Sequence, residues 1–87
     1  MALIDDFELA QTEVKQLKAT PAPNELLTLY AFFKQATVGD VSGARPGMLD
    51  FKGRAKFDAW EQKKGQSKDA CMQGYVDFVA ELKRRYA

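Results

Sequence analysis

Apolar residues recur along this chain at intervals of three and four, which is the spacing of one face of an α-helix. The pattern appears in four segments, and none shows the sustained alternation of apolar and polar residues typical of a strand. We therefore predict an all-α domain. Near the start of the first segment, Asp5 and Glu8 are spaced as in a capping box. Its apolar stripe consists of Phe7, Ala10, Val14 and Leu17.

The second segment begins at Pro23, because proline is favoured as the first residue of a helix. One side of it carries Leu26, Leu27, Tyr30, Phe33 and Thr37. Gly39 is the natural end of this helix, since glycine readily adopts the left-handed conformation of a C-terminal cap. From Gly39 to Leu49 the apolar period disappears while Gly and Pro accumulate. We expect a loop of about a dozen residues here, and loops of that length often carry function.

Two further helices follow the loop, each preceded by a residue suited to cap it. Asp50 precedes the third segment and Ser67 the fourth, while Gly65 marks the end of the third. The stripe of the fourth segment consists of Cys71, Tyr75, Phe78, Leu82 and Tyr86. Aromatic residues at helical spacing usually supply the core of a small domain. We assign four of them to the core on this ground: Phe57, Trp60, Phe78 and Tyr86.

The length and composition of the chain describe one small domain over residues 1–87. Cys71 is the only cysteine and there is no histidine, so an internal disulfide and the usual zinc sites are excluded. The amino terminus lacks the features of a signal peptide, and no apolar run approaches the roughly 20 residues of a membrane span. We therefore expect a soluble cytoplasmic protein without metal, cofactor or membrane insertion.

The net charge of +1 conceals an asymmetry along the chain. Residues 1–40 contain three lysines and six acidic residues, whereas residues 41–87 contain ten Lys or Arg and six acidic residues. A domain that binds duplex DNA is usually strongly basic overall, so nucleic-acid binding is the weakest hypothesis. The scale of this basic half suits a small anion.

Two pairs of residues are candidates for holding such an anion. Tyr30 and Lys34, like Lys52 and Lys56, lie four residues apart and share a helix face. Lysine suits a phosphate oxygen, and tyrosine offers both a hydroxyl donor and a flat ring. Taken alone, such a pair is more often a solvated lysine beside a tyrosine at the edge of the core. Lys34 is the exception, because it is the only charge in the second helix after its first turn.

Catalysis has little support in the sequence. There is no histidine, and the serines and the cysteine lie in loop, cap and helix positions, so the usual nucleophile–base pairs cannot be assembled. We expect no enzymatic activity.

Three motifs resemble those of the acyl-CoA-binding proteins, of the diazepam-binding inhibitor (endozepine) type. They are the run from Lys34 to Asp40, the turn from Arg45 to Met48, and the cluster from Lys52 to Trp60. They occur in the family's order and spacing, and the similarity covers nearly the whole chain. The resemblance implies a four-helix bundle of up-down-down-up order that binds long-chain acyl-CoA without catalysis.

The resemblance also implies site residues. By position, Tyr30, Lys34 and Lys56 match the residues that hold the 3′-phosphate of CoA. Tyr75 matches an aromatic residue that helps enclose the head group, and Lys15 matches a further basic contact. The family's continuous binding segment corresponds to Tyr30, Ala31, Phe32, Phe33 and Lys34. Its acyl-chain groove corresponds to Phe7, Ala10 and Leu27.

The leading hypothesis is therefore a carrier that binds, buffers and transports medium- to long-chain acyl-CoA. The chain departs from the family pattern at Phe33, where tyrosine is usual, and at Gln11, where a small apolar residue is preferred. An alternative is an interaction module that uses the face of Tyr30 and Lys34 to dock a protein or peptide. We expect a monomer in either case.

Overall fold

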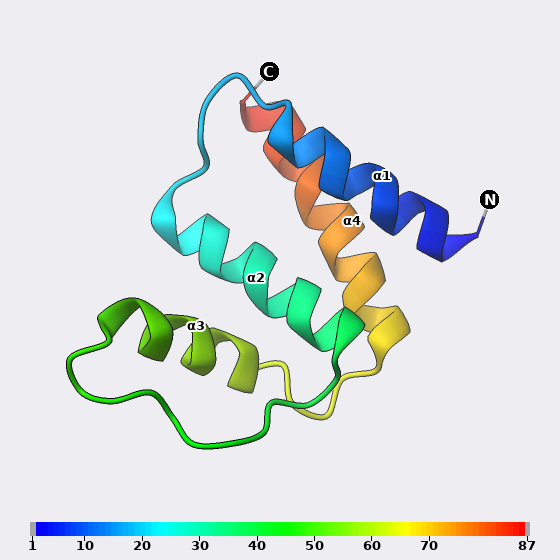
Figure 1. The fold of residues 1–87 in the computed structure, drawn as a ribbon. Helices are drawn as coiled ribbons and strands as arrows, with labels where there is room; N and C mark the ends of the chain where they lie inside the picture. The colour runs from blue at the N-terminus through cyan, green and yellow to red at the C-terminus, as the bar shows by residue number, and fades with distance from the viewer. Residues whose placement is uncertain (1, 87) are drawn as a thin grey trace.

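The computed structural model describes residues 2–86 as four helices (Figure 1). Their bounds are α1 Leu3–Lys15, α2 Pro23–Thr37, α3 Phe51–Glu61 and α4 Lys68–Arg85. Helix α4 packs against both α1 and α2, whereas α3 packs against α2 alone. Helices α2 and α3 run in the same direction, because the long loop between them leads the chain back along the molecule (Figure 1). The described residues contain no strand, and the predicted four-helix, up-down-down-up fold is confirmed.

Helix ends follow local chemistry at four of the six predicted positions. Helix α3 ends at Glu61, before the predicted stop at Gly65. Helix α2 begins at Pro23, and Gly39 has the positive φ of 97° that suits a residue after a helix end. The Asp50 carboxylate accepts a hydrogen bond from the Gly53 amide at 2.9 Å. The Ser67 hydroxyl accepts one from the Ala70 amide at 3.0 Å. These contacts satisfy backbone donors that the first turns of α3 and α4 leave without partners.

The predicted cap of the first helix is wrong. Helix α1 begins at Leu3, and no side chain hydrogen-bonds its first amides. Asp5 therefore lies within the first turn, where its negative charge still interacts favourably with the helix dipole.

The core lies where α4 meets α1 and α2. Its buried members are Phe7, Ala10, Leu29, Ala36, Cys71, Tyr75, Val79 and Leu82. Phe78 and Tyr86 pack against this cluster from its edge. The assignment of Phe57 and Trp60 to the core is wrong, because α3 has one neighbouring helix and contributes no buried residue. Trp60 instead donates its indole N–H to the Gly39 carbonyl at 2.8 Å.

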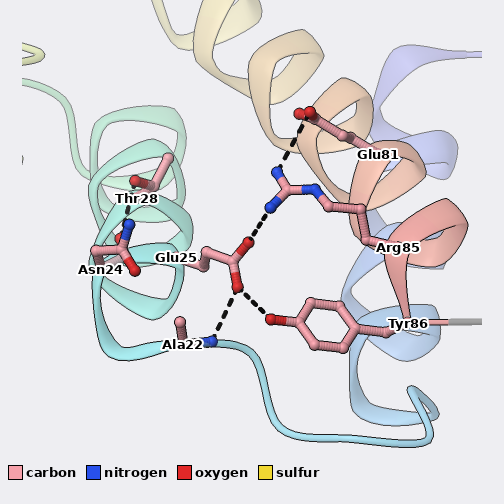
Figure 2. Close-up of polar contacts among 7 residues, drawn as sticks. All are labelled: Ala22, Asn24, Glu25, Thr28, Glu81, Arg85 and Tyr86. Atoms are coloured by element: carbon pink, nitrogen blue, oxygen red, sulfur yellow. Dashed lines mark hydrogen bonds and ion pairs between the residues drawn. The ribbon is translucent and has the colours of Figure 1, made fainter.

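A buried carboxylate joins the end of α4 to the start of α2 (Figure 2). Glu25 is 6% exposed, and its Oε1 accepts hydrogen bonds from the Tyr86 hydroxyl at 2.5 Å and the Ala22 amide at 2.9 Å. Its Oε2 pairs with Arg85 Nη1 at 2.6 Å. The hydrogen bonds from Tyr86 and Ala22, together with the Arg85 charge, hold the pKa of Glu25 below its usual value despite burial. The end of α4 thus anchors the first turn of α2.

A second set of polar contacts anchors the loops on either side of α3. The Asp40 carboxylate accepts hydrogen bonds from the Gly65 amide and from Gln35 Nε2, each at 2.8 Å. The Gln35 amide also donates to the Gln66 carbonyl at 2.9 Å. Arg45 forms a salt bridge of 2.6 Å with Asp58 and so ties the long loop to α3. These contacts place α3 beside α2 although α3 buries no side chain completely.

Candidate functional site

The two parallel helices α2 and α3 enclose an apolar groove. Its volume is about 330 Å³. The lining residues are Pro23, Leu26, Leu27 and Tyr30 from α2, and Phe51, Lys52, Ala55 and Lys56 from α3. The two lysines are the only charged members of this lining within the described chain. The groove therefore offers apolar walls with cations along one edge.

Cations and aromatic rings pair across the same two helices. The Lys56 Nζ lies 5.5 Å from the centre of the Tyr30 ring, and the Lys34 Nζ lies 5.0 Å from the centre of the Trp60 ring. Each helix contributes one aromatic residue and one lysine, four positions apart, so the two pairs are one helical turn apart. Each ammonium group rests against a ring face, an interaction that is weak near water and leaves the cation able to bind an anion.

The structure brings together the three residues implied for the 3′-phosphate, which are Tyr30, Lys34 and Lys56. Lys34, which the sequence singles out as an isolated charge, is half-buried and lies at the α2–α3 interface. Tyr30 is half-buried and Lys56 is exposed, and both line the groove. Leu27, implied for the acyl groove, lines it too.

The five consecutive residues from Tyr30 to Lys34 do not share one face, because successive residues on a helix point about 100° apart. Ala31 is buried at 2% exposure. Phe32 lies against Gly74 of α4, and the Lys63 Nζ lies 4.2 Å from the centre of its ring. Phe33 turns toward α1, where its ring centre is 6.0 Å from that of Phe7.

Three of the implied residues belong to the core cluster. Phe7, Ala10 and Tyr75 are all buried, and the rings of Phe7 and Tyr75 meet edge to face at 5.1 Å. The Phe33 ring is 6.5 Å from that of Tyr75. Burial raises the pKa of Tyr75. These side chains pack against the part of α2 that carries Phe33, next to Tyr30 and Lys34 along the helix.

Lys15 lies apart from these groups, at the end of α1. It is exposed and lines a second hollow of about 340 Å³ between α1 and α2. Leu26 forms part of both this hollow and the α2–α3 groove. The two depressions are therefore neighbours across a single side chain.

Phe51 and Leu26 are groove residues that the sequence reasoning missed. Both are exposed large apolar side chains, Phe51 at 76% and Leu26 at 44%. Phe51 was signalled by its position directly before Lys52, in a segment whose apolar period is weak. Leu26 was signalled by its place beside Leu27 in the apolar stripe of the second segment. Gln11, the polar departure, directs its amide to the Phe7 carbonyl at 3.4 Å within α1.

Other classes of site have little support in the structure. Among residues 2–86, no group of His, Cys, Asp and Glu side chains is arranged to hold a metal ion. None of the helices described combines the length and apolar character needed to cross a bilayer. The chemistry of the groove is that of an amphipathic anion site, with ammonium and phenol donors beside apolar walls.

Comparison with known proteins gives the same description. The family model "Acyl CoA binding protein" matches residues 5–79. The Acyl-CoA-binding protein homolog 1 of Caenorhabditis elegans is 51% identical over 80 residues, which is 92% of this chain and 93% of that protein. The Acyl-CoA-binding protein homolog of Drosophila melanogaster is 48% identical over 83 residues, which is 95% of this chain and 96% of that protein.

A solved structure agrees in its fold. The crystal structure of Acyl-CoA-Binding Protein 2 from Oryza sativa superimposes with a TM-score of 0.91 at 38% identity, covering 97% of this chain and 93% of that one. The matched family is one of non-catalytic proteins whose ligand is acyl-CoA, as the resemblance implied. On the family match and these identities, the chain belongs to the acyl-CoA-binding protein family.

Proposed function

We propose that this protein binds medium- to long-chain acyl-CoA in the α2–α3 groove, and that it buffers and transports the thioester in the cytoplasm. The observation that carries the proposal is the position of two cation–aromatic pairs beside an apolar groove, on the same two helices. In this proposal residues 1–87 act as one binding domain and as a monomer.

The acyl chain occupies the apolar part of the groove. Leu27 and Phe51 form its walls, and the cavity of about 330 Å³ lies within the range of small-molecule sites. Each methylene removed from water contributes about 0.8 kcal/mol. Affinity should therefore rise with acyl length until the groove is filled, and the protein prefers chains that fill it.

The phosphates of CoA bind at the cationic edge. Lys34 and Lys56 exchange their contacts with aromatic rings for charge-assisted hydrogen bonds to phosphate, which are about twice as strong as neutral ones. Tyr30 supplies a hydroxyl donor and a ring between the apolar and the charged parts. Part of the affinity is therefore electrostatic and falls with added salt.

The other implied residues have different roles in this proposal. Phe7, Ala10 and Tyr75 form the wall that holds Phe33 and the turn of α2 carrying Lys34. Ala31 allows α2 to pack closely, and Phe32 joins α2 to α4. Lys15 contributes charge from the neighbouring hollow, where it can approach the head group around Leu26.

Calorimetric titration with palmitoyl-CoA, free CoA and palmitate tests the proposal. The wild-type protein should bind palmitoyl-CoA much more tightly than either fragment. Lys34→Ala should weaken that binding by roughly tenfold or more, since a hydrogen bond to a charged group contributes about 1.5–3 kcal/mol. Lys68→Ala, which removes an exposed lysine at the start of α4, is the matched control and should bind as the wild type does.

A contrary result is equally clear. If palmitoyl-CoA binds no more tightly than free CoA, the groove does not hold an acyl chain. The face of Tyr30 and Lys34 would then be a docking surface for a protein or peptide, and acyl-CoA would not compete with that partner.

A further inference from the structure

The first turn of α2 forms one end of the apolar groove, yet none of its apolar side chains is buried. Pro23 and Leu26 line the groove and are both exposed. Among residues 23–26, only Glu25 is buried. The first residue of α2 to join the core is Leu29, about one turn further along. The position of the first turn therefore depends on the contacts of a carboxylate.

Three groups bind that carboxylate (Figure 2). The Arg85 guanidinium and the Tyr86 hydroxyl reach Glu25 from the end of α4, and the Ala22 amide reaches it from the residue before α2. We call Glu25, Arg85 and Tyr86 the Glu25 cluster. Arg85 also pairs with Glu81 at 3.2 Å, which fixes the guanidinium from its other side (Figure 2).

The Glu25 cluster is attached to rigid structure at both ends. The Tyr86 amide donates to the Leu82 carbonyl at 2.8 Å, and the Leu82 side chain is fully buried in the core. At the other end, the Ala22 carbonyl accepts hydrogen bonds from the amides of Glu25 and Leu26 at 2.9 and 3.0 Å. A continuous set of contacts thus runs from the core of α4 to Leu26, which lines the groove.

The cationic end of the groove is held by different contacts. Lys34 lies nine residues after Glu25, which is roughly two and a half turns along α2. Trp60, the ring beside Lys34, donates to the Gly39 carbonyl, and Gln35 donates to the Asp40 carboxylate. These hydrogen bonds do not involve the Glu25 cluster. The two ends of the groove are therefore fixed separately.

We propose that the Glu25 cluster positions the acyl chain, because it holds the apolar end of the groove in the shape that binds a long chain. Arg85 and Tyr86 are positioning residues, which act on the ligand through Glu25 and the first turn of α2. This role rests on the acyl-binding function proposed for the groove. When the cluster is broken, binding a chain must first order the turn, and affinity falls. Affinity for the CoA head group is retained.

A purely structural role of the same contacts has a different consequence. A contact that only stabilises the folded state changes how much of the protein is folded. Affinity for either part of the ligand then stays the same as long as nearly all of the protein remains folded. The ratio of the affinities for palmitoyl-CoA and free CoA therefore separates the two roles.

The test is calorimetric titration of the double variant Arg85→Gln with Tyr86→Phe, using palmitoyl-CoA and free CoA. The two substitutions leave Glu25 with one of its three partners. Affinity for palmitoyl-CoA should fall by roughly tenfold, whereas affinity for free CoA should stay within about twofold. Circular dichroism and urea unfolding check that the variant is folded.

Two further variants sharpen the comparison. Arg85→Lys keeps the positive charge beside Glu25 and should retain most of the wild-type ratio of affinities. Lys83→Gln is the matched control, since Lys83 lies in the same last turn of α4 and is 48% exposed, against 51% for Arg85. Its partner is Glu13 of α1, so the substitution leaves α2 untouched. Both ligands should bind to it as they do to the wild type.

Amide hydrogen exchange of the ligand-free protein gives a second readout. The amides of Leu26 and Leu27 should exchange faster in the double variant, by roughly tenfold, because the first turn of α2 opens more often. The amides of Lys34 and Gln35 should exchange at the wild-type rate. This measurement needs no ligand.

The positioning role is wrong if the double variant keeps the wild-type ratio of affinities, or if its affinities for palmitoyl-CoA and free CoA fall equally. It is also wrong if Lys83→Gln lowers the ratio as much, or if exchange at Leu26 is unchanged. A wild-type protein that binds palmitoyl-CoA no more tightly than free CoA is a separate failure. That result would overturn the acyl-binding function itself, and the positioning role with it.

Discussion

At the scale of single residues, the groove is built from side chains that have weak partners in the free protein. Lys34 and Lys56 rest on the rings of Trp60 and Tyr30, contacts that contribute about 0.5–1 kcal/mol at exposed sites. A phosphate offers each lysine a stronger contact. These lysines are not held in salt bridges within the described chain, which leaves their charge available for the anion binding that we propose.

Tyr30→Phe separates the hydroxyl of Tyr30 from its ring. The hydroxyl forms none of the hydrogen bonds between described residues, so we expect the free energy of unfolding to stay within about 0.5 kcal/mol of the wild type. Affinity for palmitoyl-CoA should fall by roughly tenfold, because a donor to phosphate is lost. Calorimetry and urea unfolding measure the two quantities. Unchanged affinity would show that only the ring of Tyr30 contacts the ligand.

Leu82→Ala tests the core at the level of one side chain. Leu82 is fully buried, so the substitution should lower the free energy of unfolding by about 2–5 kcal/mol through lost burial and a cavity. Leu9→Ala removes the same atoms from a side chain that is 52% exposed, and it should cost far less. Urea unfolding of both variants gives the comparison. Equal losses would place the main core elsewhere.

At the scale of elements, α2 contributes both to the proposed binding groove and to the core. One side carries the groove and its cations, while the other packs on α4. Helix α4 permits this close packing at Gly74, where an added Cβ would overlap three carbons of the Phe32 ring. The glycine is required there by proximity and not by its backbone conformation.

Gly74→Ala should therefore destabilise the protein although alanine favours helices. We expect a loss of about 1–3 kcal/mol, since the half-buried Phe32 ring must shift to make room. In a Phe32→Ala background the same substitution should become stabilising by about 0.5–1 kcal/mol, because only helix propensity remains. Urea unfolding of the four proteins in this cycle measures the reversal of sign. Stabilisation in both backgrounds would contradict the close approach.

At the scale of the whole molecule, carboxylates hold distant parts of the chain together. Glu25 joins the start of α2 to the end of α4, and Asp40 joins the loops before and after α3. Hydrogen bonds lower the pKa of each, from Tyr86 and Ala22 to Glu25, and from Gly65 and Gln35 to Asp40. Both groups are therefore more acidic in the folded protein than in the unfolded chain.

The stability of the fold should consequently decline in acid. A carboxyl whose pKa is lower in the folded state stabilises the fold above its unfolded pKa, 4.5 for Glu25 and 3.8 for Asp40. That contribution disappears as the pH falls from there through the folded pKa. Urea unfolding at neutral pH and at a series of acid values should show a plateau and then a decrease.

Glu25→Gln isolates one part of this pH dependence. The variant should be less stable at neutral pH, and its stability should decline less steeply below about pH 4.5. Identical slopes for the variant and the wild type would mean that Glu25 contributes nothing to the acid response.

Much of the fold was predictable because its signals are local. Asp50 and Ser67 cap their helices through amides three residues away, and Pro23 needs only its own ring to begin α2. The misassignment of Trp60 shows the limit. Its spacing identifies a face of a helix, but that face is buried only as far as other helices cover it, and α3 has one neighbour.

The candidate site likewise combines features that are local in the sequence with features that depend on long-range packing. The isolated charge of Lys34 and its spacing from Tyr30 are properties of one helix, so the sequence was sufficient to select them. The pairing of these residues with Trp60 and Lys56, and the contribution of Phe51, depend on α3 lying parallel to α2. That placement rests on contacts such as Asp40 with Gly65, which are 25 residues apart.

Helix positions, the caps of α3 and α4, charge asymmetry and family thus follow from the order of residues, since each is set by interactions within a few positions or by motifs read directly along the chain. Whether an apolar residue lines the groove or lies in the core is decided by the tertiary structure. Phe7 and Leu27 were both assigned to the acyl groove, yet Phe7 is buried against Tyr75 while Leu27 lines the groove. The difference arises because burial depends on which helices meet, and only long-range packing determines that.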